Sequence, residues 1–398
     1  MRKFLSLLIV LCLAVTAQAQ SDTLVTDSVP WAQRLRLRID SILATPLLET
    51  SQLGLLVYDM TADSTLYAYG HRQTLRPAST MKLLTAITAL EQLPADYQLT
   101  TTLSYTGRID RGTLVGNLWC RGGMDPLFGT DDMRYFVSSL RQLGVDTIRG
   151  RVLADMSFKE DVDFGEGWCW DDDNSVLSPL LVERKDNFAE TLGRELRRGG
   201  VVVIDSVVSM GVNVKTVQRI RVCSRSHTVD ELLMPMMKES DNLYAEALFY
   251  HIAANVSRPA KVKQAVSQVK KMIQKVALAP GDYRVADGSG LSLYNYVSAE
   301  LETRLLRYAW KRPQLFERLY NTLPIAGVDG TLKNRMMKGA ATGNVHAKTG
   351  TVSGVSSLAG YCSAVNGHEL CFAIINQGIM RMADGRGLQD QLCEAMCR

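Results

Sequence analysis

Histidine is scarce in this chain, and neither its histidines nor its cysteines are spaced as metal ligands usually are. The five histidines form no H-x-x-x-H pair or similar cluster, and none of the eight cysteines belongs to a C-x-x-C pair. Structural and catalytic metal ions are held by such closely spaced groups. We therefore expect no metal site, and we expect no other cofactor.

The chain also lacks a strong charge imbalance and a long apolar run. Its 45 basic residues face 41 acidic ones, which predicts no nucleic-acid partner and at most peripheral membrane association. The apolar run at residues 4–15 follows two basic residues and precedes Ala17-Gln18-Ala19, which is typical of a secretory signal. Because this run is too short to span a bilayer, we predict a signal peptide over residues 1–19 that is cleaved after Ala19.

Seven cysteines remain after that cleavage, an odd number in a compartment that permits disulfides. Asn366-Gly367 is typical of a two-residue hairpin turn, and counting outward from it places Cys362 opposite Cys371. Either the two form a disulfide, or they are small side chains that fill a buried sheet face. We favour the second interpretation and assign no disulfide.

Hydrophobic periodicity divides the mature chain, which is long enough for two domains, into unlike parts. A helix, a strand pair and a long helix precede residue 97, β-rich segments follow it, and a helical block begins at residue 229. We therefore predict a domain formed by residues 20–96 and 229–398, interrupted by an inserted domain at 97–228. The predicted strands are 53–60, 64–69, 98–105, 112–120, 149–153, 201–208, 219–223 and 370–376, and the predicted helices are 31–43, 131–143, 187–198, 229–238, 243–254, 261–276 and 297–311.

Ser79 and Lys82 open the long helix, which Pro77 pre-organises and which no Pro or Gly interrupts before Pro94. Residues three apart share a helix face, so this spacing sets a hydroxyl beside an amine, a nucleophile beside a base. The spacing alone is weak, since Ser267 and Lys270 repeat it within a helical packing face.

Two further motifs follow in order, Ser240-Asp241-Asn242 at a predicted helix joint and Lys348-Thr349-Gly350 on a predicted strand. This trio is the one that marks class A β-lactamases and penicillin-binding proteins. Over nearly the whole mature chain the sequence resembles the D-alanyl-D-alanine carboxypeptidase/endopeptidase family, the low-molecular-mass class C penicillin-binding proteins related to bacterial penicillin-binding protein 4. The blocks that carry this resemblance are residues 116–126, 287–292, 326–332 and 347–361.

Two departures from the family pattern stand out. Arg121 and Met124 interrupt a run that is usually richer in glycine. The 158-residue interval between Lys82 and Ser240 is short, which predicts one inserted domain with a third domain absent or vestigial. The resemblance implies a mixed α/β (α+β) fold of the serine β-lactamase/DD-peptidase-like transpeptidase type, an antiparallel sheet flanked by helices with one inserted β-rich domain.

The resemblance also implies roles for the motif residues. Ser79 is the expected nucleophile and Lys82 its base, with Asn242 orienting Lys82 and Ser240 relaying the proton. The backbone N-H groups of Ser79 and Thr351 are the expected oxyanion hole. Substrate is expected to bind at Lys348, Thr349, Gly350 and Thr351, while Asp125 either binds the peptide stem or forms a turn before Pro126.

The leading hypothesis is a periplasmic serine-type D-Ala-D-Ala carboxypeptidase, with endopeptidase activity as a second activity. Its expected partners are peptidoglycan stem peptides and, as covalent inhibitors, β-lactam antibiotics. A serine β-lactamase and a non-catalytic wall-binding protein of the same fold stay open as alternatives. The acidic stretch at residues 161–173 offers Glu166 and Asp171 as an acid and base pair, but we interpret it as a solvated loop.

Overall fold

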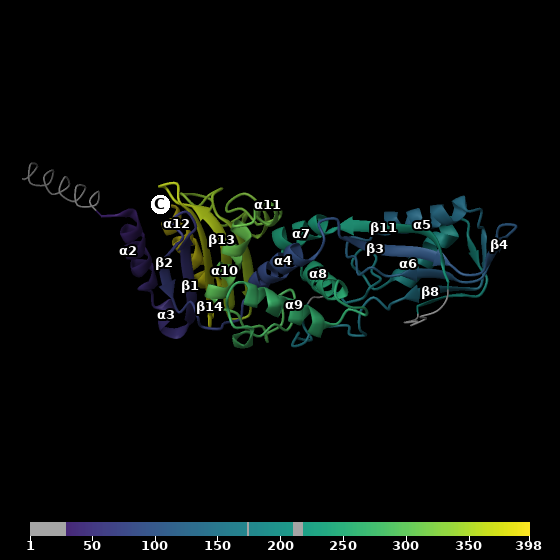
Figure 1. Ribbon diagram of the computed structural model, residues 1–398, viewed down its shortest axis with the longest axis horizontal. Helices are drawn as coiled ribbons and strands as arrows, with labels where there is room; N and C mark the ends of the chain where they lie inside the picture. The colour runs from purple at the N-terminus through teal and green to yellow at the C-terminus, as the bar shows by residue number, and fades with distance from the viewer. Residues whose placement is uncertain (1–28, 173–174, 210–217) are drawn as a thin grey trace, which may run out of the picture.

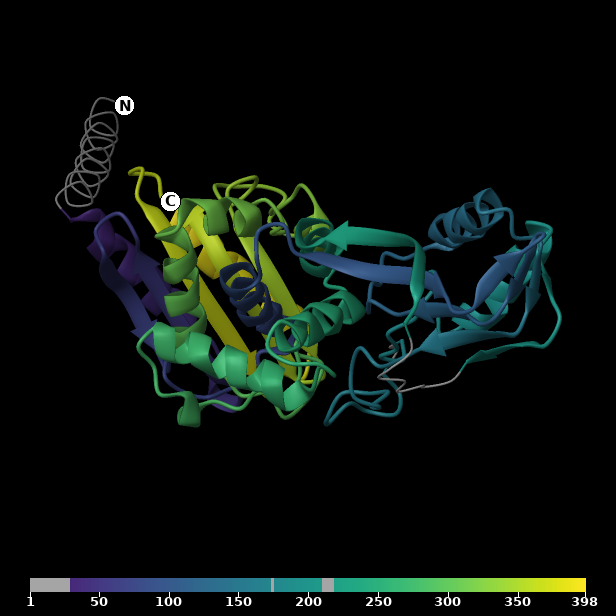
Figure 2. The same ribbon diagram turned by 45° about the vertical axis from the view of Figure 1, so that its right-hand side comes forward.

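The computed structural model describes residues 29–172, 175–209 and 218–398, so the predicted signal segment 1–19 lies outside the described residues. Two bodies lie side by side along the long axis, and the strands β3 (Gln98–Tyr105) and β11 (Ile220–Thr228) lead from one into the other (Figures 1 and 2). Among the described residues, no helix has the length and hydropathy that a bilayer crossing needs.

The first body is built on a five-stranded antiparallel sheet. Its strand order is β12 (His346–Val352), β13 (Val355–Ser363), β14 (Glu369–Gln377), β1 (Gln52–Asp59) and β2 (Ser64–Tyr69). Strand β1 pairs with β14 from Gln52 opposite Gln377 to Asp59 opposite Leu370, so the two ends of the chain share one sheet. The predicted fold, an antiparallel sheet flanked by helices, is confirmed.

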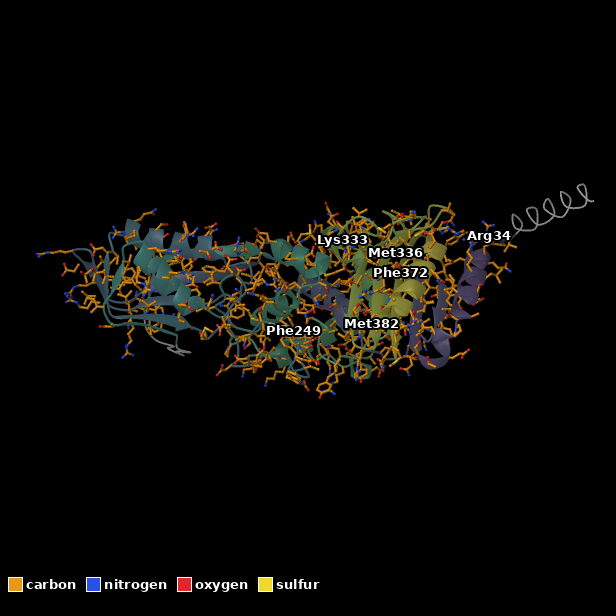
Figure 3. All side chains as sticks on the ribbon, turned by 180° about the vertical axis from the view of Figure 1, so that it is seen from behind. Arg34, Phe249, Lys333, Met336, Phe372 and Met382 are labelled. Carbon is orange, nitrogen blue, oxygen red and sulfur yellow. The ribbon has the colours of Figure 1, made fainter. Side chains whose placement is uncertain are left out.

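Helices cover both faces of this sheet, and its central strands are therefore apolar on both sides. On β1, Leu55 and Val57 pack with α2 (Trp31–Leu43) and α12 (Met382–Cys397), whereas Leu56 packs with α4 (Met81–Gln92), α8 (Asn242–Ala254) and α10 (Ala299–Trp310). Phe372 and Phe249, labelled in Figure 3, belong to these two different layers.

The hairpin between β13 and β14 is one residue longer than its sequence predicts. Cys362 stands opposite Leu370, and Cys371 stands opposite Tyr361. Gly367 adopts φ +79° and donates its N-H to the Ala364 carbonyl at 2.9 Å, which makes a longer turn than the Asn-Gly pair alone. A slip of one residue sends side chains to opposite faces, so the predicted Cys362–Cys371 pairing is wrong. The two thiols lie in different apolar layers.

The second body holds two sheets built only from strands between residues 98 and 228. One has the order β10 (Ser206–Ser209), β8 (Arg151–Asp155), β6 (Leu118–Arg121), β3 and β11, and the other has the order β4 (Arg108–Asp110), β5 (Thr113–Val115), β7 (Thr147–Arg149) and β9 (Val202–Val203). The helices α5 (Thr130–Gln142) and α6 (Phe188–Arg198) complete its core. The predicted strand 112–120 is two strands, because Gly116 at φ +151° breaks it.

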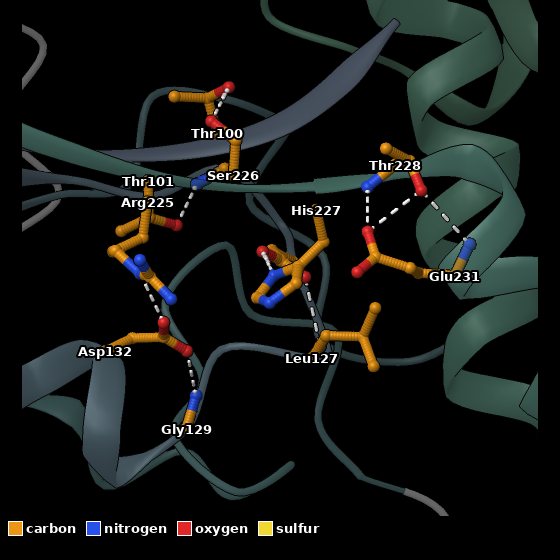
Figure 4. Close-up of polar contacts among 12 residues, drawn as sticks. Thr100, Thr101, Leu127, Gly129, Asp132, Arg225, Ser226, His227, Thr228 and Glu231 are labelled. Carbon is orange, nitrogen blue, oxygen red and sulfur yellow. Dashed lines mark hydrogen bonds and ion pairs between the residues drawn. The ribbon is translucent and has the colours of Figure 1, made fainter.

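The boundaries 97–228 stay a prediction. This segregation of strands supports them, although Phe158, Leu177 and Leu181 from within the range pack into the helical layer of the first body. Strand β11 passes directly into α7 (Val229–Lys238), where Thr228 and Glu231 form a capping box (Figure 4).

The remaining helices follow the predicted periodicity with one addition. α9 (Val262–Lys275) matches its prediction within a residue. α11 (Pro313–Tyr320) was not predicted, and Pro313 begins it as the first helical residue, a position that proline favours. Short elements complete the chain: α3 (Leu47–Thr50) and the 3₁₀ turns η1 (Ala78–Thr80), η2 (Pro280–Asp282) and η3 (Gly330–Leu332).

Candidate active site

Ser79 and Lys82 meet at the start of the central helix, as their spacing predicts. Ser79 lies in η1, which runs straight into α4, and Lys82 lies one turn later. The Lys82 Nζ is 2.8 Å from the Ser79 Oγ, and the lysine has no exposed surface. The pair is therefore a hydroxyl in direct contact with a buried amine.

The second motif reaches the same point from the joint between α7 and α8. Asp241 caps α8 by accepting the Tyr244 N-H, so Asn242 begins the helix. The Asn242 Oδ1 accepts a hydrogen bond from Lys82 Nζ at 2.8 Å. Ser240 adopts φ +64°, a left-handed conformation that is uncommon for serine. Strain of this kind concentrates at functional sites.

The third motif lies on β12, the edge strand of the sheet. Lys348 is fully buried, and its Nζ donates to the Ser240 Oγ at 2.8 Å and to the Thr349 carbonyl at 2.7 Å. The Thr349 hydroxyl donates to the Thr331 Oγ1 at 2.7 Å. The structure thus brings all three motifs together, with Ser240 tied to Lys348 and Asn242 tied to Lys82.

Gly350 is the point of closest approach between β12 and the nucleophile. A Cβ at this position would lie 2.1 Å from the Ser357 Oγ, 2.7 Å from the Pro77 carbonyl oxygen and 2.9 Å from the Ser79 backbone nitrogen. Real Cβ contacts are not this short, so only glycine fits. The Ser357 hydroxyl donates to the Pro77 carbonyl at 2.5 Å and thereby fixes the start of the Ser79 turn against the sheet.

A loop that the motif trio does not include completes the surroundings of Lys82. The Ser289 carbonyl accepts the third Lys82 hydrogen bond at 2.8 Å. Glu246 holds this loop by accepting the N-H groups of Gly288 and Ser289 at 3.0 and 2.8 Å. Asp287 accepts the N-H groups of Gly290 and Ser292 at 2.8 and 2.6 Å.

Sequence reasoning missed Glu246, although a signal was present. It is an acidic residue within the apolar run of α8, one turn after Asn242, and its side chain is buried. Buried acids are rare unless they have partners. The sequence marks residues 287–292 only as a block that resembles the family.

Burial sets the electrostatics of this cluster. It lowers the pKa of Lys82 to about 8, against the opposing attraction of Asp287, Glu246 and Asp241. Burial, with the nearby Asp287 charge, raises the pKa of Glu246 to about 8. Burial and the Lys82 charge hold the pKa of Lys348 well below its usual value. A lysine with a pKa this near neutrality is equipped to act as a base.

The acidic stretch interpreted as a solvated loop is in part docked on the first body. Trp168 donates its indole N-H to Asp287 Oδ2 at 2.9 Å. Glu166 forms an exposed ion pair with Arg284 at 3.0 Å, so it does not pair with Asp171. The acidic stretch therefore supplies the Trp168 indole as a hydrogen-bond donor to Asp287, the carboxylate that orders the loop beside Lys82. The acidic composition of the stretch does not reveal this contact.

The hydrogen bonds of Asp125 go to residues outside this cluster. Its side chain has no exposed surface, accepts the Leu127 N-H at 3.0 Å and pairs with the His227 Nδ1 at 2.6 Å. Figure 4 shows His227 on β11, next to Leu127. The structure favours the turn-forming role of Asp125, and its contact with substrate stays a prediction.

Fold and site together define a class of protein. A helix that begins with an activated serine, packed against the edge strand of an antiparallel sheet that carries a second lysine, is the arrangement of serine acyl-transfer hydrolases.

The comparisons with known proteins narrow this class to one family. The family model described as D-Ala-D-Ala carboxypeptidase 3 (S13) family matches residues 35–181 and 181–397. The chain is 30% identical to the carboxypeptidase DacB of Mycolicibacterium smegmatis, over 87% of this chain and 80% of that protein. It is 27% identical to a D-alanyl-D-alanine carboxypeptidase of Actinomadura sp., over 95% of this chain and 87% of that protein.

A solved structure of penicillin binding protein 4 (dacB) from Haemophilus influenzae has the same fold, with a TM-score of 0.81 and 24% identity over 89% of this chain and 97% of that one. A second structure of that protein, complexed with a novel β-lactam, gives a TM-score of 0.73 and 25% identity over 92% of this chain and 98% of that one. The chain belongs to the S13 family of serine-type D-Ala-D-Ala carboxypeptidases, which are hydrolases.

Proposed function

We propose that the chain removes the terminal D-alanine from peptidoglycan stem peptides through an acyl intermediate on Ser79. The observation that carries this proposal is the set of three 2.8 Å contacts made by the buried Lys82 amine, to Ser79 Oγ, Asn242 Oδ1 and the Ser289 carbonyl. Membership of the S13 family supports D-Ala-D-Ala as the bond that is cleaved.

The three contacts give Lys82 a direction for proton transfer. An ammonium donates all three of its hydrogens. Asn242 Oδ1 and the Ser289 carbonyl can only accept, whereas the Ser79 hydroxyl can also donate. When Lys82 loses a proton, its two remaining hydrogens stay on those two acceptors and its lone pair faces Ser79. The Ser79 hydroxyl then gives its proton to Lys82 as its oxygen attacks the peptide carbonyl.

The oxyanion formed by that attack needs two donors near Ser79. We assign the backbone N-H groups of Ser79 and Thr351 to this role. The close approach of Gly350 to the Ser79 nitrogen, 2.9 Å from an ideal Cβ, supports the assignment because it brings both backbones to one point. Lys348, Thr349 and Thr351 bind the terminal carboxylate of the peptide in this scheme.

Release of D-alanine requires a proton on the leaving nitrogen. Ser240 is proposed to relay it, and the 2.8 Å contact between Ser240 Oγ and Lys348 Nζ supports a chain of exchangeable protons there. Water then attacks the ester on Ser79 and restores the enzyme. Cleavage of cross-linked peptides by the same acyl step is the proposed endopeptidase activity.

β-Lactams are proposed to acylate Ser79 as well. The β-lactam in the complex of the Haemophilus influenzae relative supports this proposal. Activity on peptidoglycan, together with the predicted signal peptide, supports a periplasmic location.

Release of D-alanine from a peptide that ends in D-Ala-D-Ala tests the proposed function. The purified mature chain is expected to release one D-alanine per peptide, and a matched peptide that ends in D-Ala-L-Ala is expected to stay intact. Slow loss of a bound penicillin is expected in the same preparation. A protein that turns penicillin over rapidly and leaves the peptide intact would be the alternative β-lactamase.

The pH dependence of acylation follows from the Lys82 pKa. Because the neutral amine is the base, kcat/KM is expected to rise with pH and to level off above about 8, the pKa of Lys82. At pH 7 about one Lys82 in ten is then neutral. A kcat/KM that is flat between pH 6 and pH 9 would contradict Lys82 as the base.

Glu246 titrates in the same range, and a variant separates the two groups. The Glu246 charge favours protonated Lys82, so Glu246→Gln removes that attraction and is expected to shift the rise in kcat/KM to lower pH. Because coupled groups share apparent pKa values, neither midpoint belongs to one residue alone. The measured quantity is therefore the difference in the kcat/KM midpoint between the wild type and Glu246→Gln. A profile that keeps its midpoint in Glu246→Gln would exclude coupling between Glu246 and the base.

A further inference from the structure

A cavity opens away from Ser79, where the inserted β-rich part of the chain meets the end of α8. Its volume is about 300 Å³. Four of its lining residues are arginines, and none of the described residues that line it is Asp or Glu. These arginines and two threonines on the neighbouring strand are the residues that matter here: Arg121, Arg219, Arg221, Arg258, Thr100 and Thr102.

The cavity is separate from the catalytic cluster. His251, which also lines it, lies nine residues after Asn242 on α8, so roughly 13 Å of helix axis separates them at 1.5 Å per residue. The ends of α4 and α8 on the cavity side are tied together, because Asn255 donates to the Gln92 carbonyl at 3.3 Å. Both helices therefore run from the serine towards the cavity.

One wall of the cavity is a polar face of the β3 sheet. On β3, Leu103 packs into the core beneath α5 and α6, while its neighbour Thr102 stands opposite Arg121 of β6. Successive side chains of a strand point to opposite faces, which puts the hydroxyl and the guanidinium on the face away from that core.

Two of the arginines are fixed by neighbours. Arg219 pairs with Asp155 at 2.7 Å and lies over the Trp119 ring at 4.1 Å. Arg258 lies over the Phe158 ring at 5.4 Å. Such contacts hold a guanidinium in place before any ligand arrives.

The other two arginines, Arg121 and Arg221, are exposed, and only the Asp155 carboxylate, which Arg219 already binds, attracts Arg121. Arg121 and Arg221 make no side-chain hydrogen bond or ion pair within the part of the chain that the structure describes. Partial burial lowers the pKa of Arg121, and the charges of Arg258 and Arg219 lower it further, against the opposing attraction of Asp155. Like charges that converge on one hollow repel each other, and a bound anion would relieve that repulsion.

We propose that this cavity binds a carboxylate-bearing stem peptide of peptidoglycan at a second site, apart from the peptide that reacts with Ser79. A guanidinium offers parallel N-H donors that match a carboxylate in a bidentate pair. The Thr100 and Thr102 hydroxyls on the same wall pair with the Ser226 and Ser224 hydroxyls at 2.9 and 3.1 Å. Each such pair uses one of its two hydroxyl protons, so the other can bind an oxygen of a ligand. The choice of peptidoglycan as the source of the carboxylate rests on the proposed function. The site would hold one stem peptide of peptidoglycan while the terminal D-alanine is removed from a neighbouring stem peptide.

Binding of a stem tetrapeptide that lacks the cleavable D-Ala-D-Ala end tests the proposal on the full mature chain, after a penicillin has acylated Ser79 so that the catalytic site is occupied. Calorimetric titration compares the wild type with Arg121→Gln/Arg221→Gln, in which affinity is expected to fall by at least about tenfold. Arg108→Gln/Arg149→Gln changes the net charge equally on the four-stranded sheet, at two exposed arginines. This control is expected to bind as the wild type does.

Two further probes identify the ligand chemistry. A tetrapeptide with amidated carboxylates is expected to lose binding at the cavity, and inorganic phosphate is expected to compete weakly. Unchanged affinity in Arg121→Gln/Arg221→Gln, equal binding of the amidated peptide, or tighter binding of phosphate would overturn the proposal. Release of D-alanine is measured in parallel and is expected to stay at the wild-type rate in Arg121→Gln/Arg221→Gln. If the wild type releases no D-alanine, the proposed function fails, whatever the binding at the cavity.

Discussion

Lys82→Met is expected to lower the rate of acylation by about 10²- to 10⁴-fold, the usual contribution of a positioned general base. The methionine keeps the length of the side chain and fills the buried site, but it cannot take the Ser79 proton. Stopped-flow measurement of acylation by a fluorescent penicillin gives the rate directly. Lys82 also donates hydrogen bonds to Asn242 and Ser289, and the methionine loses both. Circular dichroism is therefore needed to check that the variant is folded.

The chain offers a matched control for this variant. Lys270 follows Ser267 at the same spacing, on α9 instead of the active-site helix. Lys270→Met is expected to leave the acylation rate unchanged. An equal loss of acylation rate in Lys82→Met and Lys270→Met would contradict a specific role of Lys82 as the base for Ser79.

Gly350→Ala is the second substitution with a large expected effect. The added methyl would lie 2.1 Å from Ser357 Oγ and 2.9 Å from the Ser79 nitrogen, so β12 and the Ser79 turn must move apart. Separation of the proposed oxyanion donors is expected to cost about 10²-fold or more in the acylation rate. The rate is measured with the same penicillin, and the thermal midpoint reports any change in stability.

A double variant separates the two contacts. Gly350→Ala/Ser357→Ala removes the closest clash but keeps the one with the Ser79 nitrogen, so it is expected to recover stability more than rate. Gly281→Ala, where an added Cβ meets nothing within 4 Å, is the control and is expected to leave both quantities unchanged. Full acylation by Gly350→Ala would contradict the close approach of β12 to the nucleophile.

The parts of the site that the sequence predicts are those carried by local geometry and by ordered motifs. Ser79 and Lys82 are one helical turn apart, so their contact follows from helix periodicity once the helix is placed. No local rule brings Asn242 and Lys348 to that turn. Their convergence was predicted only because the three motifs, in their order, carry the family resemblance.

Contacts between segments that no motif links could not be predicted. Glu246 reaches the loop at Ser289 because two distant backbone segments pack together, and nothing in the sequence gives that packing. The hairpin at Gly367 shows the same limit on a small scale, since one extra turn residue moved Cys362 and Cys371 to opposite faces. The arginines of the cavity beside β3 come from three separate segments, and only the fold brings them together.

Mass spectrometry of the penicillin-treated mature chain tests the central claim most directly. The account predicts one covalent adduct per chain, located by peptide mapping on the segment that contains Ser79, and no adduct in Ser79→Ala. An adduct on any other residue, or undiminished labelling of Ser79→Ala, would contradict the assignment of Ser79 as the nucleophile.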